Sequence, residues 1–330
     1  MYVVTGGAGF IGSAMVWKLN SLGIDNIIVV DNLGSSEKWK NLVNRRFYSY
    51  LHRDEFLRQV QEDKVPDRLQ GIVHMGACSS TTERDADFLM RNNLNYSKIL
   101  CMYAEYKNIR FINASSAATY GNGQAGFDDD HTRLYTLKPL NMYGYSKHLF
   151  DLWALKRMEQ GLGLSKCASL KFFNVYGPNE DHKGEMRSVA SKAFASIRQT
   201  GKMQLFRSRH PQYGDGGQMR DFVYVKDCVE IIWWLLEHPE VNGIFNIGSG
   251  QAARTWNDLA AAVFAGMDVP LNIEYIDMPE VLRGKYQNFT EAKIERLRAA
   301  GYSRPMYSLE EGVKDYVQRY LQADDHTLES

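Results

Sequence analysis

The sequence has little cysteine and no excess of either charge, and both features narrow what the protein can be. Its four cysteines (Cys78, Cys101, Cys167 and Cys228) are scattered, without a C-x-x-C pair. This usage is typical of a reduced, cytoplasmic compartment rather than of a disulfide-stabilised secreted domain. Lysine plus arginine and aspartate plus glutamate both number 39. Because the chain has no basic stripe or tail, we expect no nucleic-acid partner.

Long apolar runs and metal-ligand spacings are missing as well. An apolar patch such as IIWWLL (231–236) is far shorter than the roughly 20 residues that cross a bilayer, so we expect no membrane partner. Met1 leads directly into the strand-like YVVT, without the charged region that opens a signal peptide, so we expect none. The eight histidines show no H-E-x-x-H or comparable spacing. Nothing in the sequence therefore argues for a metal site.

The chain does have an ordinary globular composition and a repeating pattern of strands and helices. Its 330 residues are 44% hydrophobic and 24% charged, which suffices for about two domains with a core. Short β-branched runs predict strands at 2–5, 27–30, 47–50, 71–74, 110–114 and 168–173. Longer amphipathic stretches predict helices at 11–22, 54–63, 84–107, 142–160 and 187–200. This alternation predicts an α/β fold with a doubly wound parallel (Rossmann) sheet covered on both faces.

After about residue 174 the pattern loosens, which predicts a second, smaller α/β lobe. FVYV (222–225) and GIFNIG (243–248) have the composition of strands that return to the main sheet. We therefore assign 1–173 and 221–250 to the Rossmann domain, and 174–220 and 251–330 to a substrate domain. The polar tail after Gln322 is expected to be frayed.

A glycine-rich loop, TGGAGFIG (5–12), follows the first strand and opens the first helix. Gly6, Gly9 and Gly12 fit a GxxGxxG spacing, and Gly7 with the last two fits GxGxxG. Either spacing allows a tight turn that brings the backbone close to a pyrophosphate, which the free N–H groups of the helix then bind. Asp31 ends the second strand 19 residues after Gly12, where a carboxylate binds a ribose hydroxyl. The loop therefore predicts a dinucleotide cofactor.

The residues alone leave open which nicotinamide cofactor this is. Asp31 by itself favours NAD, because a carboxylate repels a 2′-phosphate. Lys38, a few residues on, and Arg53, after the third strand, could offset that repulsion. Both cations can equally be ordinary surface charges.

Two Y-x-x-x-K patterns are candidates for proton transfer. This spacing places tyrosine and lysine on one helix face, where the ammonium is expected to lower the tyrosine pKa and so favour proton removal from a sugar hydroxyl. Ligands of a doubly wound sheet bind beyond the carboxyl ends of its strands, where only the first turns of a helix lie. Tyr143 and Lys147 begin their helix, whereas Tyr103 and Lys107 lie near the end of theirs. We therefore assign catalysis to the first pair and a structural role to the second.

Two further segments end at the same edge of the sheet. The fifth strand runs into NASSAATYG (113–121), so Ser115 or Ser116 could hydrogen-bond the reacting oxygen beside Tyr143. The sixth strand runs into NVYGPNEDHKGEMR (174–187), which brings Lys183 to the ligand edge. That position makes Lys183 a candidate for chemistry rather than an ordinary solvated lysine.

Taken together, these segments resemble the extended short-chain dehydrogenase/reductases. The matching segments are, in order, TGGAGFIG (5–12), DNL (31–33), SSAATYG (115–121), YGYSK (143–147) and FNVYGP (173–178). Within that superfamily, nearly the whole chain resembles the ADP-L-glycero-D-manno-heptose 6-epimerase family. The segments that carry this resemblance are HMGACSSTTE (74–83), PLNMYGYSK (139–147), FFNVYGPNEDHKGEM (172–186), RDFVYVKD (220–227), LRGKYQNFT (282–290) and LRAAGY (297–302).

The resemblance implies an isomerase that inverts C6 of ADP-D-glycero-D-manno-heptose for the inner core of lipopolysaccharide. It implies transient oxidation with one tightly bound NADP per subunit, favoured over NAD, in a cytoplasmic homo-oligomer that the family suggests is a pentamer. The catalytic residues would be Ser116, Tyr143, Lys147 and Lys183. Lys183 would be the second acid/base, because one group is poorly placed for both orientations of the oxygen. Tyr143 and Lys183 would then serve one epimer each.

The resemblance also implies two sets of ligand-binding residues. The residues expected to line the cofactor are Gly6, Gly9, Phe10, Ile11, Gly12, Asp31, Asn32, Lys38, Arg53, Met75, Gly76, Ala77, Cys78, Ser79, Asn92, Lys147, Val175 and Lys183. The residues expected to contact the substrate are Ser116, Asn174, Glu185, Lys192, Phe206, Arg207, Ser208, Arg209, Arg220 and Tyr286. The chain departs from the family at Glu185, where relatives carry serine, at Lys192, often histidine, and in a longer segment at 207–219.

Other functions fit fewer of these residues. A UDP-hexose 4-epimerase shares the glycine loop, Ser116, Tyr143 and Lys147, but it does not explain CSSTTE (78–83) or HKG (182–184). A 4,6-dehydratase is expected to carry a Thr-Asp-Glu triplet near Ser116, which SSAATYG lacks. A non-catalytic NADP-binding protein does not need an intact serine, tyrosine and lysine set. The helices at 84–107 and 142–160 carry more apolar residues than one sheet face requires, which favours a homo-oligomer.

Overall fold

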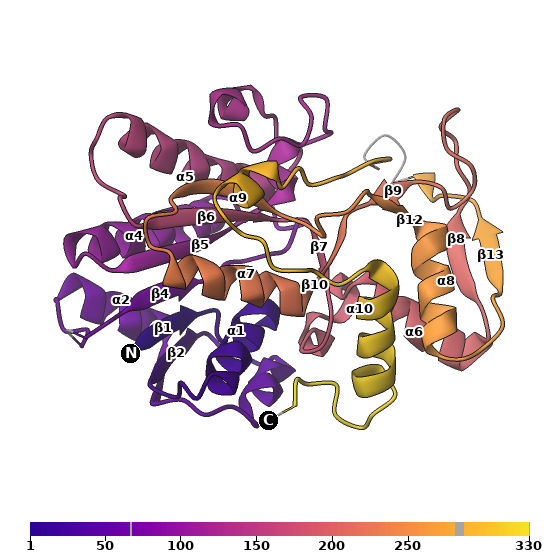
Figure 1. Cartoon of the computed structure of the whole chain (residues 1–330), viewed down its shortest axis with the longest axis horizontal. Helices are drawn as coiled ribbons and strands as arrows, with labels where there is room; N and C mark the ends of the chain where they lie inside the picture. Colours follow the sequence, from indigo (N-terminus) through magenta and orange to yellow (C-terminus); the bar gives the residue numbers. More distant parts are fainter. Residues whose placement is uncertain (67, 281–286, 330) are drawn as a thin grey trace.

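A computed structural model describes residues 1–66, 68–280 and 287–329 of the chain, and Figure 1 shows a larger and a smaller lobe side by side. The larger lobe is built on a seven-stranded sheet in the order β11-β6-β5-β4-β1-β2-β3. All neighbouring strands in it are parallel. Its strands are β1 (Tyr2–Thr5), β2 (Ile27–Asp31), β3 (Ser49–His52), β4 (Gly71–His74), β5 (Arg110–Ser116), β6 (Cys167–Phe172) and β11 (Gly243–Ile247).

Helices cover both faces of this sheet, because each strand turns alternate apolar side chains to opposite sides. Val4 packs in one core with Val16 and Ile231, and Val3 packs in another core with Phe150. The helices of the first core that cover the sheet include α1 (Phe10–Ser21) and α7 (Val225–Glu237), and this core continues into the smaller lobe. Those of the second core are α2 (Arg53–Gln61), α4 (Tyr96–Tyr106) and α5 (Met142–Glu159).

The smaller lobe combines helices with three two-stranded sheets. The sheets pair β7 (Asn174–Tyr176) with β10 (Phe222–Tyr224), β8 (Met203–Phe206) with β13 (Ile273–Ile276), and β9 (Met219–Arg220) with β12 (Arg254–Thr255). Its helices are α6 (Val189–Thr200), α8 (Trp256–Gly266) and α10 (Leu309–Tyr316). The short helix α9 (Glu295–Ala299) instead lies against β11 of the larger lobe (Figure 1). Short helical turns elsewhere are η1 (Glu37–Leu42), η3 (Ala117–Tyr120), η4 (His131–Thr136), η5 (Asp181–Met186) and η7 (Val317–Leu321).

The predicted fold class is confirmed, and most predicted elements lie within a few residues of the observed ones. The helix expected at 84–107 is divided into α3 (Ala86–Leu89), a π-helical turn η2 (Met90–Asn95) and α4. The prediction for 222–225 was wrong: β10 pairs with β7 instead of returning to the main sheet, whereas β11 does return. The division into two domains stays a prediction.

The tail after Gln322 is not frayed, contrary to the prediction from its polar composition. Leu328 is fully buried in the same core as α1 and α10. Figure 1 shows the yellow tail running from α10 towards the larger lobe. A single apolar side chain with a complementary site is enough to dock the segment, and composition alone does not reveal that site.

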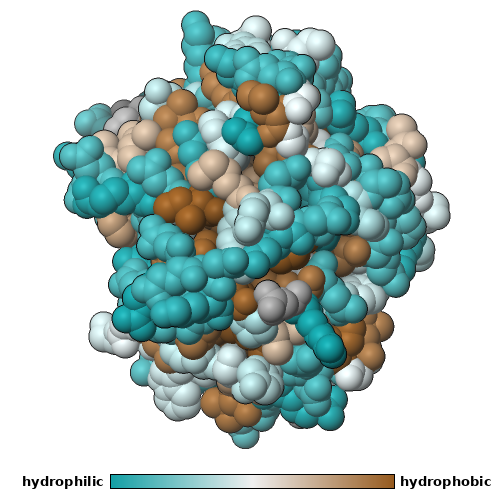
Figure 2. Space-filling model, turned by 90° about the vertical axis from the view of Figure 1, so that its left-hand side faces the viewer, coloured by the Kyte–Doolittle hydropathy of each residue, from teal (hydrophilic) through white to brown (hydrophobic). Residues whose placement is uncertain are grey.

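Among the helices in the described ranges, none combines the length and the apolar character needed to cross a bilayer. Figure 2 shows a mostly hydrophilic face with separate hydrophobic patches. On the helices predicted to pack between subunits, exposed large apolar side chains include Met102, Tyr106 and Tyr145. Association through these helices stays a prediction.

Candidate active site

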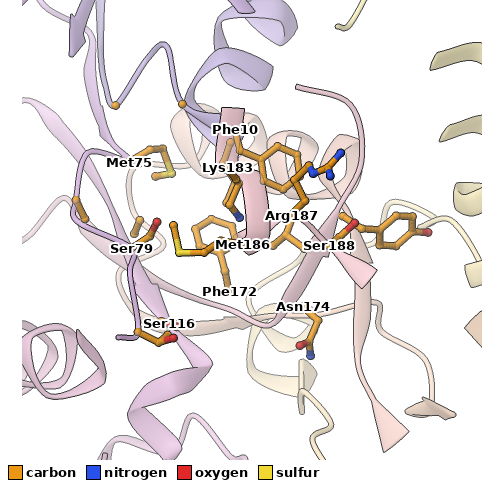
Figure 3. Close-up of a pocket in the computed structure, with 18 of the residues that line it drawn as sticks. Phe10, Met75, Ser79, Ser116, Phe172, Asn174, Lys183, Met186, Arg187 and Ser188 are labelled. Atoms are coloured by element: carbon orange, nitrogen blue, oxygen red, sulfur yellow. The ribbon is translucent and has the colours of Figure 1, made fainter. Parts of the chain in front are cut away.

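A cavity of about 790 Å³ lies at the carboxyl edge of the sheet, where the two lobes meet. The glycine loop, the end of β5 and the first turns of α5 line it from the larger lobe. The segment after β6 lines it from the other side. Figure 3 shows Lys183 pointing into this space beside Phe10 and Met186, with Ser116 on the opposite side. The edge predicted from the topology is therefore where the cavity lies.

The glycine loop has the shape that a pyrophosphate requires. A Cβ at Gly12 would lie 2.0 Å from the carbonyl oxygen of Gly6, which itself has a φ of +63°. Only glycine fits both positions without a shift of the backbone. Within the described part of the chain, the N–H groups of Phe10, Ile11 and Gly12 have no backbone or side-chain acceptor. The loop thus fits an anion at the start of α1.

A second cavity, of about 160 Å³, adjoins the glycine loop at the end of β2. Its lining includes Asp31, Asn32, Lys38, Arg53 and Asn92. The Lys38 Nζ lies 2.7 Å from the Asp31 carboxylate, and Arg53 donates a hydrogen bond to Asn92. The cation of Lys38 therefore offsets the carboxylate that would repel a phosphate here.

The predicted tyrosine and lysine occupy the first two turns of α5. The helix begins after Asn141, whose side chain accepts a 2.8 Å hydrogen bond from the N–H of Gly144, as helix-capping residues do. Lys147 Nζ donates to the carbonyl oxygen of Ala114 at 2.6 Å, at the end of β5. Burial lowers the pKa of Lys147 to about 8. Both Tyr143 and Lys147 line the large cavity.

The expectation that the neighbouring ammonium lowers the pKa of Tyr143 is not met. Burial raises the pKa of Tyr143 above its ordinary value, and a hydrogen bond with Ser116 only partly opposes this. The reason is that desolvation of the phenolate outweighs the nearby donors. Tyr143 is therefore a neutral phenol at neutral pH, and it is ready to donate a proton.

The two serines left open by the sequence have different surroundings. Ser115 donates a 2.6 Å hydrogen bond to the buried carboxylate of Asp151. Ser116 caps the start of η3, accepts from the N–H of Ala118 at 3.1 Å, and lines the cavity together with Tyr143. The geometry therefore favours Ser116 as the partner of a reacting oxygen.

Lys183 lies in η5 and faces the same cavity as Tyr143. Its Nζ lies 5.2 Å from the centre of the Phe10 ring. Burial lowers the pKa of Lys183, and the carboxylate of Glu180 acts in the opposite direction. A lowered pKa brings an amine closer to proton exchange at neutral pH. The two predicted acid/base groups thus share one cavity, although they come from separate segments.

The predicted substrate residues are divided between the cavity and its surroundings. Asn174 and Glu185 line the cavity, and Lys192 lies 3.3 Å from the Glu185 carboxylate. The guanidinium carbon of Arg220 lies 5.3 Å from the centre of the Trp256 ring, and Trp256 lines the cavity. The residues that lie outside the cavity lining are Lys192, Phe206, Arg207, Ser208, Arg209 and Arg220. Tyr286 lies outside the residues that the structure describes.

Some lining residues were not predicted from the sequence, among them Thr81, Phe172, Met186, Arg187, Ser188 and Trp256. Arg187 and Ser188 come three and four residues after the HKG segment (182–184), and that proximity could have indicated them. Trp256 comes from the start of α8, and no sequence pattern links it to the cavity. The alternative Tyr103 and Lys107 pair lies elsewhere, and Lys107 forms a 2.6 Å ion pair with Asp63.

A dinucleotide loop beside a serine, a tyrosine and a lysine at one sheet edge defines a nicotinamide-dependent enzyme of the short-chain dehydrogenase type. The model of the NAD dependent epimerase/dehydratase family matches residues 2–248. The ADP-L-glycero-D-manno-heptose-6-epimerase of Nitratidesulfovibrio vulgaris is 65% identical over 99% of this chain and 100% of that protein. The enzyme of the same name from Fusobacterium nucleatum is 48% identical over 99% and 100%.

Solved structures agree with these relatives. The ADP-L-glycero-D-manno-heptose-6-epimerase of Helicobacter pylori superposes with a TM-score of 0.80 at 27% identity, covering 96% of this chain and 95% of that one. The UDP-glucose 4-epimerase of Thermus thermophilus, solved with NAD, gives a TM-score of 0.72 at 26% identity, covering 95% and 96%. The chain therefore belongs to the NAD dependent epimerase/dehydratase family and, within it, to the ADP-L-glycero-D-manno-heptose-6-epimerases. It is an epimerase that uses a nicotinamide cofactor.

Proposed function

We propose that the protein interconverts ADP-D-glycero-D-manno-heptose and ADP-L-glycero-D-manno-heptose, and that Tyr143 and Lys183 exchange the protons. The observation that carries this proposal is the shared cavity. A phenol at the start of α5 and an amine in η5 both face the space beside the glycine loop. An epimerase must protonate an oxygen in two orientations, and two groups on different segments suit that task.

In this scheme each residue has a separate task. When bound, the nicotinamide would accept hydride from C6 of the sugar and return it to the opposite face of the same carbon. Ser116 hydrogen-bonds the reacting oxygen, and Tyr143 exchanges its proton in one orientation. Lys183 exchanges the proton when the transient aldehyde has rotated. Lys147, anchored to the carbonyl oxygen of Ala114 at 2.6 Å, would bind the cofactor from the wall of the cavity that Tyr143 also lines.

An epimerisation assay tests the proposal. The purified protein, with no added cofactor, is incubated with ADP-D-glycero-D-manno-heptose, and the C6 signals are followed by NMR. We expect an equilibrium mixture of both C6 epimers, because the cofactor is not consumed. UDP-glucose in a parallel sample is expected to stay unchanged. Conversion of UDP-glucose to its C4 epimer, with the heptose unchanged, would instead favour a UDP-hexose 4-epimerase, in which Lys183 has no assigned task.

We further propose that the cofactor is NADP, bound tightly, with its 2′-phosphate beside Lys38 and Arg53. The small cavity brings both cations together, and Lys38 already offsets Asp31. Removing Lys38 in Lys38→Ala is expected to weaken NADP binding by roughly 10- to 100-fold, because a charge-assisted hydrogen bond contributes about 1.5–3 kcal/mol. NAD binding should change by less than about threefold, since NAD lacks that phosphate.

Dissociation constants for NADP and NAD, measured by calorimetry on cofactor-free protein, check this result. Lys40→Ala is the matched control, because Lys40 lies on the same helical turn and pairs with Glu37 at the surface. Equal loss of NADP and NAD affinity in Lys38→Ala would show that Lys38 supports the fold of the site and does not select the phosphate. A cytoplasmic location and a pentameric assembly complete the proposal.

A further inference from the structure

The C-terminal segment Ala323–Glu329, here called the tail, docks against the larger lobe. Its residue Leu328 is 0% exposed and belongs to the core that also contains Phe10 and Tyr316. Figure 1 shows the end of the chain close to α1, which begins at the glycine loop. The tail thus lies behind the cofactor side of the cavity, although it does not line the cavity itself.

The tail is tied to the loop of Lys183 through Asn179. The N–H of Leu328 donates to the side-chain oxygen of Asn179 at 2.8 Å, and the N–H of Asn179 donates to the carbonyl of His326 at 3.2 Å. The amide nitrogen of Asn179 donates in turn to Ser13, in α1, at 2.9 Å. Asn179 is 2% exposed and has a φ of +76°, a conformation that asparagine tolerates better than most residues.

Two further contacts join the same loop to the cofactor-binding segments. The side chain of Asn41, in η1, donates to the carbonyl oxygens of Ala8 at 2.9 Å and Asn179 at 3.1 Å. His326 of the tail lies 2.6 Å from the carboxylate of Asp181, two residues before Lys183. The glycine loop, η1, the tail and the start of η5 are therefore one hydrogen-bonded unit.

We propose that the tail is a positioning element of the active site, which holds Lys183 at the cavity. Lys183 lies in the short turn η5, where its N–H donates to the carbonyl oxygen of Glu180 at 2.9 Å and its amine lies over the ring of Phe10. The tail adds a restraint on this turn by fixing Asn179 and Asp181. Residues 323–329 do not line the cavity, so the tail would act only through the turn that carries Lys183. The inference rests on the proposed acid/base role of Lys183.

The test compares Leu328→Ala with the matched control Asp324→Ala, which alters an exposed residue of the same tail. Hydrogen–deuterium exchange reports whether the tail restrains the loop. In Leu328→Ala we expect the amides of 179–187 to exchange faster by roughly tenfold or more, because the tail loses the buried side chain that packs it against the core. His326→Ala, outside the core, is the second variant and guards against loss of folding. Unchanged exchange in both variants would overturn the proposal.

The second readout is the rate at which each epimer reduces the bound cofactor in a single turnover, followed by the absorbance of the reduced nicotinamide. Steady-state epimerisation needs both acid/base groups, so only this first step separates them. In Lys183→Met we expect one epimer to slow strongly and the other to react almost normally. Leu328→Ala should slow the same epimer by roughly 10- to 100-fold, since small displacements of a catalytic group have effects of that size.

The two failures can be told apart. If Lys183→Met slows both epimers equally or neither, the two-group scheme of the proposed function is wrong, and the catalytic part of this inference falls with it. If Lys183→Met is selective but Leu328→Ala slows both epimers alike, the tail serves only the stability of the fold, and the inference alone is overturned. Selective slowing in both variants, with a normal control, supports it.

Discussion

Replacing the phenol in Tyr143→Phe is expected to lower kcat for epimerisation by about 10²- to 10⁴-fold, the range for loss of a general acid/base group. The variant keeps the ring in its place at the cavity wall and removes only the hydroxyl. Because the ring packing is unchanged, KM should change little. Steady-state rates in both directions, with the C6 epimers separated by NMR, measure the effect.

The loss has a specific physical cause. In the proposed scheme, the groups that remain in the cavity without the Tyr143 hydroxyl are Ser116, a poor acid, and Lys183 on the other side (Figure 3). Lys147 cannot replace the phenol without leaving the carbonyl of Ala114, to which it donates at 2.6 Å. One orientation of the oxygen is therefore left without an acid/base group.

The matched control is Tyr103→Phe, which alters the other Y-x-x-x-K tyrosine. Tyr103 is buried in α4, in the second core of the sheet, away from the cavity. Its removal should leave kcat within about twofold, since substitutions distant from a site rarely change the chemistry directly. A similar loss in both variants would mean that stability, and not proton transfer, explains the result for Tyr143→Phe.

Much of this site could be predicted because the chemistry lies where the topology puts it. In a parallel sheet the strand ends and the first helical turns meet at one edge. The position of Tyr143 in its helix therefore distinguishes it from Tyr103, and the loop after β6 reaches the same edge with Lys183. The glycine spacing likewise follows directly from the close approach between Gly12 and Gly6.

Other features could not be predicted, because they depend on distances between segments far apart in the chain. The direction of the Tyr143 pKa shift depends on how deeply the phenol is buried, which i to i+4 spacing does not reveal. The pairing of β10 with β7 depends on where the smaller lobe places each strand. The burial of Leu328 depends on an apolar site built from other elements. In each case the sequence pattern is present, but a contact with a distant segment determines the structural result.

A buried ion pair between Lys171 and Asp151 is expected to contribute strongly to the stability of the larger lobe. Lys171 of β6 and Asp151 of α5 are both 0% exposed, and the Lys171 Nζ lies 2.7 Å from the carboxylate. The same amine donates to Thr119 at 2.6 Å and lies 5.1 Å from the centre of the Tyr120 ring. The carboxylate also accepts from Ser115 at 2.6 Å. The pair thus joins β5, β6 and α5, the elements that carry Ser116 and Tyr143.

Lys171→Met is expected to lower the free energy of unfolding by about 3–5 kcal/mol, because it leaves the carboxylate of Asp151 buried without its cation. The methionine fills much of the volume of the lysine stem, so the loss reports the unpaired charge rather than a cavity. Denaturant unfolding of the variant and the parent protein at the same pH and cofactor concentration measures the difference, since bound cofactor stabilises both.

The control for this experiment is Lys166→Met, just before the same strand. Lys166 donates to the carbonyl of Asn108 at the surface, at 3.2 Å, so its loss should cost within about 0.5 kcal/mol. The double variant Lys171→Met with Asp151→Leu removes both charges and should recover part of the lost stability, because no ion then remains unpaired. Asp151 also accepts hydrogen bonds from Ser115 of β5 at 2.6 Å and Ser169 of β6 at 2.7 Å. If the double variant is no more stable than Lys171→Met, these hydrogen bonds, and not the charge of Asp151, hold the elements together. Ser115 would then be the residue through which the core holds the end of β5, where Ser116 lies.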